Sequence, residues 1–379
     1  MTHLNIPWKS FRQNPFSLYD MGRARWAQLD LSASGGATLG GRLARHRSGS
    51  DLTRQEWSAG SARPNRICAL RLLSCLAFCL LAVGCSTPTD VQVRRPDLQS
   101  SQVEHQGMTR TFHYVADDST ASTASQSKAR GLLPLVLAFH GSGGDGLWMA
   151  EASGLARLAV REGFAAVFPD GFEGTWADGR GTTPADRAGI DDVDFVKVLV
   201  RQLGEMLRVD SERMFAVGFS NGGMFVQRLL LEWPEGFRAG ATVGATLPEN
   251  LGDRPLRGPF RPLLLVHGTS DPIVPWAGGM VSSTNGGRVL SMPATVDFWA
   301  GRGGFSARGE AEALPDRFDD GTTVRRWRYG AGALQLCEIQ NGGHGWPGVA
   351  APPPASIFGH TCQEFAAEEA AWHFFQEQN

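Results

Sequence analysis

Three short segments of the sequence contain residue types that together could perform nucleophilic catalysis. Ser220 stands in Gly-Phe-Ser-Asn-Gly-Gly, where the glycines leave room for a sharp turn. A serine hydroxyl is a weak nucleophile at neutral pH, so it needs a base, and the base needs an orienting carboxylate. Asp271 and His344 follow Ser220 in the chain and could supply these roles. We therefore predict Ser220 as nucleophile, His344 as base and Asp271 as the acid that orients it.

Each of these residues also has a plainer interpretation. Ser220 could cap a Gly-rich turn, Asp271 could cap the turn that follows it, and His344 could be an exposed loop histidine. The order Ser, Asp, His along the chain, each just after a predicted strand, favours the catalytic interpretation. His140 and His267 are weaker candidates for the base because each directly follows its strand and precedes a glycine.

Acyl transfer also needs hydrogen-bond donors for the oxyanion of the tetrahedral intermediate. One donor should be the backbone N–H of Asn221, which follows the nucleophile, and the second should come from the Gly-rich segment 140–146. We predict Ser142 as the second donor, with Gly143 as the next choice. A phosphate-binding loop is the rival interpretation of this segment, but the segment lacks the Gly-Lys-Ser/Thr ending.

Strands and helices must position these residues, and the hydrophobic pattern indicates where they lie. Short apolar or alternating runs predict strands at 111–115, 132–139, 165–168, 214–217, 241–243, 263–266, 323–329 and 334–339. Longer stretches predict helices at 148–162, 191–207, 222–232, 294–300 and 363–375. This alternation indicates one α/β domain with a mostly parallel central sheet and helices on both faces. Functional groups then gather on loops after the carboxyl ends of the strands.

Composition differs between the front of the chain and the rest. With 42% hydrophobic residues the chain is too apolar to be disordered, and a net charge of −2 argues against a nucleic-acid partner. Residues 1–71 contain 11 basic and 4 acidic residues, whereas the remainder has a net charge of −9. An uncharged run at 72–84 follows this basic region and ends at Cys85. This is the layout of a secretory signal, and the run is too short to span a bilayer.

We therefore expect four parts in the chain. Residues 1–62 are a disordered extension or come from an overcalled translation start, 63–84 are an export signal, 85–107 are a polar tether and 108–379 are the catalytic domain. The Ala-Val-Gly-Cys run at 82–85 resembles the bacterial lipoprotein processing box, so Cys85 is the expected lipidation site and the only expected membrane anchor. An ordinary core cysteine on a short buried helix is the alternative. The product would be periplasmic or extracellular.

Two further cysteines, Cys337 and Cys362, would remain with Cys85 after processing. In an oxidising compartment they are the pair available for a disulfide, and two buried free thiols are the alternative.

Segments 137–145, 218–223, 267–275 and 342–348 together resemble α/β-hydrolase esterases of the polyhydroxybutyrate-depolymerase type and the feruloyl and acetylxylan esterases of carbohydrate-esterase family 1. The resemblance covers roughly residues 108–375. It implies an α/β-hydrolase fold and hydrolysis of a carboxylic ester by Ser220, His344 and Asp271, with no metal or organic cofactor. The sequence departs from the family at Gly345, where threonine is frequent, and at 301–305, where a cysteine is frequent.

The resemblance leaves the substrate open. Trp176, Trp276 and Trp346 could line an apolar acyl pocket or could serve ordinary packing. Short hydroxyalkanoate esters or oligomers are the first expectation, because no polyester-binding domain is visible in the sequence, and feruloyl or acetylxylan esters are the alternative. A serine peptidase on the same fold and a non-catalytic binding lipoprotein are further alternatives.

Overall fold

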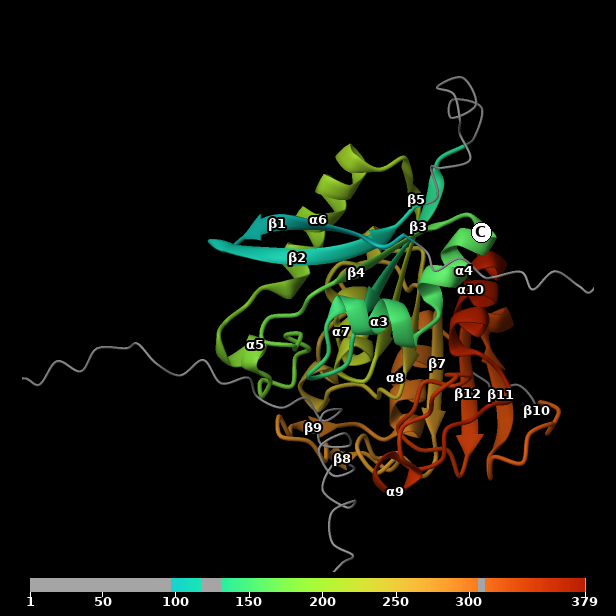
Figure 1. Cartoon of the computed structure of the whole chain (residues 1–379). Helices are drawn as coiled ribbons and strands as arrows, with labels where there is room; N and C mark the ends of the chain where they lie inside the picture. Colours follow the sequence, from blue (N-terminus) through green and yellow to red (C-terminus); the bar gives the residue numbers. More distant parts are fainter. Residues whose placement is uncertain (1–96, 117–130, 306–310, 379) are drawn as a thin grey trace, which may run out of the picture. The chain divides into compact units, whose positions relative to one another are not determined.

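The structure, a computed structural model, describes residues 97–116, 131–305 and 311–378 (Figure 1). These residues fall into one compact unit. No helix among them is long and apolar enough to cross a membrane. The predicted extension at 1–62, the export signal and Cys85 lie outside the described residues.

A ten-stranded sheet with the order β1-β2-β4-β3-β5-β6-β7-β12-β11-β10 forms the centre of this unit. Its middle strands run parallel to one another: β4 (Ala165–Pro169), β3 (Leu133–Phe139), β5 (Val209–Phe219), β6 (Ala239–Val243), β7 (Leu263–Gly268) and β12 (Leu334–Gln340). Antiparallel strands complete both edges: β1 (Gln99–His105), β2 (Met108–Val115), β11 (Thr323–Tyr329) and β10 (Glu312–Ala313). A separate two-stranded ribbon pairs β8 (Gly279–Met280) with β9 (Arg288–Val289).

Helices cover both faces of the sheet because successive side chains of a strand point to opposite sides. In β3, Leu135 and Leu137 pack with α6 (Asp192–Met206), α7 (Asn221–Glu232) and α8 (Met292–Gly303). Val136 and Ala138 pack with α3 (Gly146–Ala152), α4 (Leu155–Glu162) and α10 (Ala367–Glu377) on the other face. The short helices α5 (Pro184–Arg187) and α9 (Ala355–Phe358) lie in connections. The predicted α/β class with a mostly parallel sheet is confirmed.

The structure differs from the prediction in two places that the hydrophobic pattern could not show. Residues of the expected tether at 85–107 form β1, which pairs with β2 from Gln99 opposite Tyr114 to His105 opposite Met108. This strand carries mostly polar side chains, so it has no apolar run to reveal it. The single helix expected at 148–162 is two helices, because Gly154 between them has a φ of 74°.

Candidate active site

The turn between β5 and α7 places Ser220 in a backbone conformation that few non-glycine residues adopt. Its φ and ψ are 54° and −119°. A Cβ on Gly218 would lie 2.2 Å from the Gly222 carbonyl oxygen, and a Cβ on Gly222 would lie 2.2 Å from the Phe139 carbonyl oxygen. The two glycines therefore let the turn close, and this sharp strand-to-helix turn presents the serine side chain above the strand ends.

Ser220, His344 and Asp271 form one hydrogen-bonded chain. Ser220 Oγ lies 3.0 Å from His344 Nε2, and His344 Nδ1 lies 2.7 Å from Asp271 Oδ2. The three residues come from loops after β5, β12 and β7, and all are buried. A hydroxyl, an imidazole and a carboxylate in this order can transfer a proton from oxygen to the ring while the carboxylate stabilises the imidazolium.

Backbone donors fix the carboxylate of Asp271. Its Oδ1 accepts hydrogen bonds from the N–H groups of Ile273 and Val274, each at 2.8 Å. Burial alone would raise the pKa of Asp271, but the neighbouring His344 and the hydrogen bonds from His344 and Val274 hold that pKa below its usual value. The carboxylate is therefore ionised at neutral pH, as the stabilisation of an imidazolium requires.

The loop that carries His344 is hydrogen-bonded to the end of α9 and to the segment that follows it. The His344 N–H donates to the Phe358 carbonyl at 2.6 Å, and the Gly343 N–H donates to the His360 carbonyl at 2.7 Å. The ring of Phe219, the residue before Ser220, lies 5.0 Å from the imidazole. Contacts from two distant parts of the chain thus fix the ring beside the serine.

The two other histidines at strand ends have different partners. His140 Nε2 accepts from the Gly171 N–H at 2.8 Å, so its Nδ1 carries the proton. His267 Nε2 lies 2.9 Å from the Val274 carbonyl oxygen. Burial lowers the pKa of both rings, so both are neutral at neutral pH. Their surroundings are those of structural histidines, in line with their lower ranking from the sequence.

In the Gly-rich loop after β3, the two residues predicted for the second oxyanion donor differ in their backbone hydrogen bonds. The Gly143 N–H donates to the Gly174 carbonyl at 2.8 Å, and the Gly144 N–H donates to the Gly141 carbonyl at 3.1 Å. The N–H of Ser142 has no acceptor among the described residues, and Ser142 lines the cleft beside the serine. Gly143, the second choice from the sequence, is therefore engaged elsewhere.

A contact from the β8–β9 ribbon fixes the side chain of Ser142. Asn285 Nδ2 donates to Ser142 Oγ at 2.6 Å. The next residue, Gly286, accepts a hydrogen bond on its carbonyl from Arg180 Nη1 at 2.6 Å. The sequence gives no sign of this bridge because its ends are 143 residues apart.

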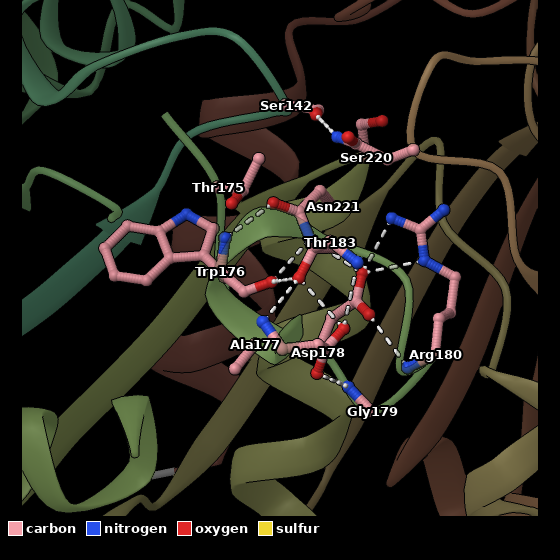
Figure 2. A network of polar contacts seen from close by, with 12 residues as sticks. Ser142, Thr175, Trp176, Ala177, Asp178, Gly179, Arg180, Thr183, Ser220 and Asn221 are labelled. Carbon is pink, nitrogen blue, oxygen red and sulfur yellow. Dashed lines mark hydrogen bonds and ion pairs between the residues drawn. The ribbon is translucent and has the colours of Figure 1, made fainter. Parts of the chain in front are cut away.

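A buried polar network surrounds the side chain of Asn221 (Figure 2). Asn221 Oδ1 accepts from the Trp176 N–H at 2.8 Å, and Asn221 Nδ2 donates to the Trp176 carbonyl at 3.1 Å. The same Nδ2 donates to Asp178 Oδ2 at 2.6 Å. Asn221 was predicted for its backbone N–H, at the first residue of α7, and its side chain in addition fixes the segment that begins at Trp176.

The cleft beside Ser220 has a volume of about 310 Å³ and is lined by both apolar and polar side chains. The sequence did not indicate which apolar side chains line the cleft, although Phe219 adjoins the nucleophile and Trp148 follows the Gly-rich loop. The polar groups on its surface include Arg180, Ser142 and Ser283. Its apolar lining comprises Trp148, Phe219, Met224, Ile273, Val281 and Phe358.

The three tryptophans predicted to line the acyl pocket lie elsewhere. Trp176 is fully buried, and its Nε1 donates to the His140 carbonyl at 3.0 Å. Trp346 is also buried, and its Nε1 donates to Glu368 at 3.0 Å. Trp276 lines a different cleft. The prediction was wrong because nearness to a motif along the chain does not fix the direction in which a side chain points.

Cys337 and Cys362 are both buried free thiols, so the predicted disulfide is wrong and the alternative applies. Burial raises the pKa of Cys337 to about 12 and also raises that of Cys362. The number of cysteines does not show whether the fold brings the Cβ atoms of two of them close enough for a disulfide. No group of three His, Cys, Asp or Glu side chains in the described ranges could hold a metal ion.

Known proteins similar to this chain are esterases. The putative esterase NocK of Nocardia uniformis subsp. tsuyamanensis is 30% identical over 253 residues, which cover 64% of this chain and 73% of that protein. Feruloyl esterase B of Piromyces equi is 28% identical over 223 residues, which cover 56% of this chain and 39% of that protein. The solved acetyl xylan esterase from Aspergillus awamori is 17% identical with a TM-score of 0.47, over 65% of this chain and 94% of that one. No family model matches the chain.

The similarity to NocK covers most of that protein. The chain also has the strand order and the strand-to-helix turn at Ser220 described above. The chain belongs to the esterases of the α/β-hydrolase type and is a carboxylic ester hydrolase.

Proposed function

We propose that this esterase works through an acyl-enzyme on Ser220. Ser220 Oγ attacks the acyl carbon of the ester while His344 Nε2 accepts the hydroxyl proton. Asp271 stabilises the imidazolium from the Nδ1 side. The backbone N–H groups of Asn221 and Ser142 donate to the oxyanion, which bears the charge that develops on the carbonyl oxygen. The bond to the alcohol then breaks, and the alcohol leaves with the proton from His344.

The second half of the reaction repeats these steps with water. His344 takes a proton from a water molecule, and the hydroxide oxygen attacks the acyl carbon of the acyl-enzyme. The bond to Ser220 Oγ breaks, the serine regains its proton from His344, and the carboxylic acid leaves. The observation that supports this proposal most directly is the hydrogen-bonded chain of 3.0 Å and 2.7 Å from Ser220 through His344 to Asp271.

For the substrate we propose short hydroxyalkanoate esters or oligomers. A cleft of about 310 Å³ lined by both apolar and polar side chains suits a short acyl chain that carries oxygen. Feruloyl or acetylxylan esters are the second candidate, favoured by the similarity to feruloyl esterase B and to the bifunctional acetylxylan esterase/xylanase XynS20E of Neocallimastix patriciarum, which is 28% identical over 169 residues.

A panel of substrates tests this choice. The purified enzyme is given hydroxybutyrate oligomers, methyl ferulate, acetylated xylan and an aminoacyl amide, and kcat/KM is measured for each. Hydroxybutyrate oligomers should give the highest value. A higher value for methyl ferulate or acetylated xylan would favour the second candidate, and cleavage of the amide alone would indicate a peptidase and contradict the esterase mechanism.

We also propose that the enzyme is exported, with Cys85 as the lipidated first residue of the mature protein. The basic region before the uncharged run at 72–84 supports this proposal. Mass spectrometry of the protein from its natural source should find a mature N-terminus at Cys85 with attached acyl chains. A mature chain that begins before residue 63 would contradict it.

A further inference from the structure

Arg180 is a buried cation on the surface of the cleft that contains Ser220. Only 2% of its side chain is exposed, and it lines the cleft together with Ser142 and Asn221. Its charge is balanced by the fully buried carboxylate of Asp178. Neither role proposed above, acid–base catalysis or oxyanion binding, uses this arginine.

The guanidinium has more donors than the protein satisfies. Arg180 Nε donates to Asp178 Oδ2 at 2.9 Å, Nη2 lies 2.8 Å from the same oxygen, and Nη1 donates to the Gly286 carbonyl at 2.6 Å. A guanidinium carries five N–H groups, so one on each Nη atom has no protein acceptor among the described residues. Because Arg180 lines the cleft, an acceptor oxygen that enters it can accept a hydrogen bond from these N–H groups.

The two free N–H groups of Arg180 are connected to the nucleophile through Asp178 and Asn221. Asp178 Oδ2, which pairs with Arg180, also accepts from Asn221 Nδ2 at 2.6 Å, and Asn221 follows Ser220 in the chain. In the view of Figure 2 the guanidinium projects from the Asp178 carboxylate on the side on which Ser220 lies. A substrate bound to Ser220 therefore occupies the same cleft that Arg180 lines.

The leaving alcohol must lie against His344, because Nε2 of that residue gives it a proton. The ring next to His344 is that of Phe219, at 5.0 Å, whereas the hydrogen bonds and the ion pair of the Arg180 side chain go to Asp178 and Gly286. With the alcohol on the His344 side of the cleft, the acyl part is assigned to the side where Arg180 lies beside Ser142 and Asn221. Because Asp178 balances the charge of the arginine and Asp145 also lines the cleft, a neutral acceptor suits this position better than a carboxylate.

We propose that the free N–H groups of Arg180 form a subsite for a neutral acceptor oxygen on the acyl chain, a hydroxyl or a second ester carbonyl, beyond the carbonyl that is attacked. The inference rests on the proposed function of Ser220. It selects hydroxyacyl esters and their oligomers over plain alkanoyl esters of the same length. Asp178 is then a positioning residue, which aims the guanidinium and also fixes Asn221.

The test compares p-nitrophenyl esters of butanoate, 3-hydroxybutanoate and succinate with the wild type and with Arg180→Lys. The lysine keeps the charge beside Asp178 but lacks the planar pair of donors. The measured quantity is the ratio of kcat/KM for the 3-hydroxybutanoate ester to that for the butanoate ester. One hydrogen bond from a charged donor predicts that Arg180→Lys lowers this ratio about tenfold. Arg228→Lys is the matched control, because Arg228 donates to the Ala177 carbonyl at 2.6 Å but does not line the cleft, and it should leave the ratio unchanged.

Other results would overturn either the arginine subsite or the proposed function of Ser220. An unchanged ratio in Arg180→Lys overturns the proposal, and a preference that moves only for the succinate ester overturns the choice of a neutral oxygen. The double variant Arg180→Met with Asp178→Asn removes both charges together, and it should lower the ratio to the same extent as Arg180→Lys. If the wild type hydrolyses none of the three esters, or if Ser220→Ala still hydrolyses them, the proposed function fails whatever the arginine does.

Discussion

The hydrogen bond between Asn285 and Ser142 offers a sharp test of the proposed oxyanion site. The Gly143 N–H donates to the Gly174 carbonyl, so of the two predicted donors, Ser142 and Gly143, Ser142 is the one whose N–H has no acceptor among the described residues. Asn285 Nδ2 donates to the Ser142 hydroxyl at 2.6 Å and so restrains the residue that carries this donor. Asn285→Ala removes the restraint without touching Ser220, His344 or Asp271.

The expected fall in kcat follows from the free energy of the hydrogen bond between Asn285 and Ser142. A neutral hydrogen bond between side chains contributes roughly 1 kcal/mol net, within a range of about 0.5–1.5 kcal/mol. If that free energy is lost only in the transition state, kcat falls about fivefold, with limits of roughly twofold and thirteenfold. KM should stay the same, because the oxyanion forms after the substrate has bound.

A double-mutant cycle distinguishes this effect from a general loosening of the cleft. Ser142→Ala keeps the backbone N–H but removes the acceptor of Asn285, so it breaks the same bond from the other end. Ser142→Ala, Asn285→Ala and the double variant should each lower kcat by about the same fivefold. A double variant with the product of the two single effects, about 25-fold, would refute the reasoning, and so would a change confined to KM. Circular dichroism and the thermal midpoint check that all three variants remain folded.

Three further predictions concern the fold that supports the site. Below about pH 6.5 the unfolded chain binds a proton at His267, whereas the folded chain does not, because burial lowers the pKa of this histidine. As the pH falls below that value, the free energy of unfolding should therefore decrease by up to about 1.4 kcal/mol per pH unit. His267→Gln should show a smaller loss in thermal midpoint than the wild type between about pH 7.5 and pH 5.5. Gly222→Ala should yield a misfolded or strongly destabilised protein, because the new Cβ would lie 2.2 Å from the Phe139 carbonyl oxygen. Gly204 in α6 is the control, because no atom lies within 4 Å of its Cβ position. Gly204→Ala should raise the free energy of unfolding, measured with denaturant, by about 0.5–1 kcal/mol. With its pKa raised to about 12, Cys337 should not react with Ellman's reagent in the folded protein and should react after unfolding; fast reaction in the folded protein would contradict its burial.

The elements that position the predicted catalytic residues could be predicted because each depends on local sequence. The turn at Ser220 needs its glycines within a few residues. A short apolar run predicts the strand before Asp271, and a run that mixes apolar and polar residues predicts the strand before His344. Parallel strands put their carboxyl ends at one edge of the sheet, so the three residues had to meet there. Local pattern and topology together were sufficient to bring these three residues to one place.

The surroundings of the site could not be predicted, because they depend on contacts between distant segments. The backbone of Trp176 is tied on both sides to Asn221, 45 residues later, so its ring lies in the core instead of the cleft. The bond from Asn285 to Ser142 spans 143 residues. The state of Cys337 and Cys362 depends on strand packing that a count of cysteines does not contain.

The measurement that tests the central claim most directly is covalent labelling of the enzyme with a fluorophosphonate probe, followed by peptide mass spectrometry. A serine activated by a base at 3.0 Å should react with the probe, and the adduct should lie on Ser220. Ser220→Ala should neither react nor hydrolyse p-nitrophenyl butanoate, while its thermal midpoint stays close to that of the wild type. Labelling at another residue, or ester hydrolysis near the wild-type rate in Ser220→Ala, would contradict the account.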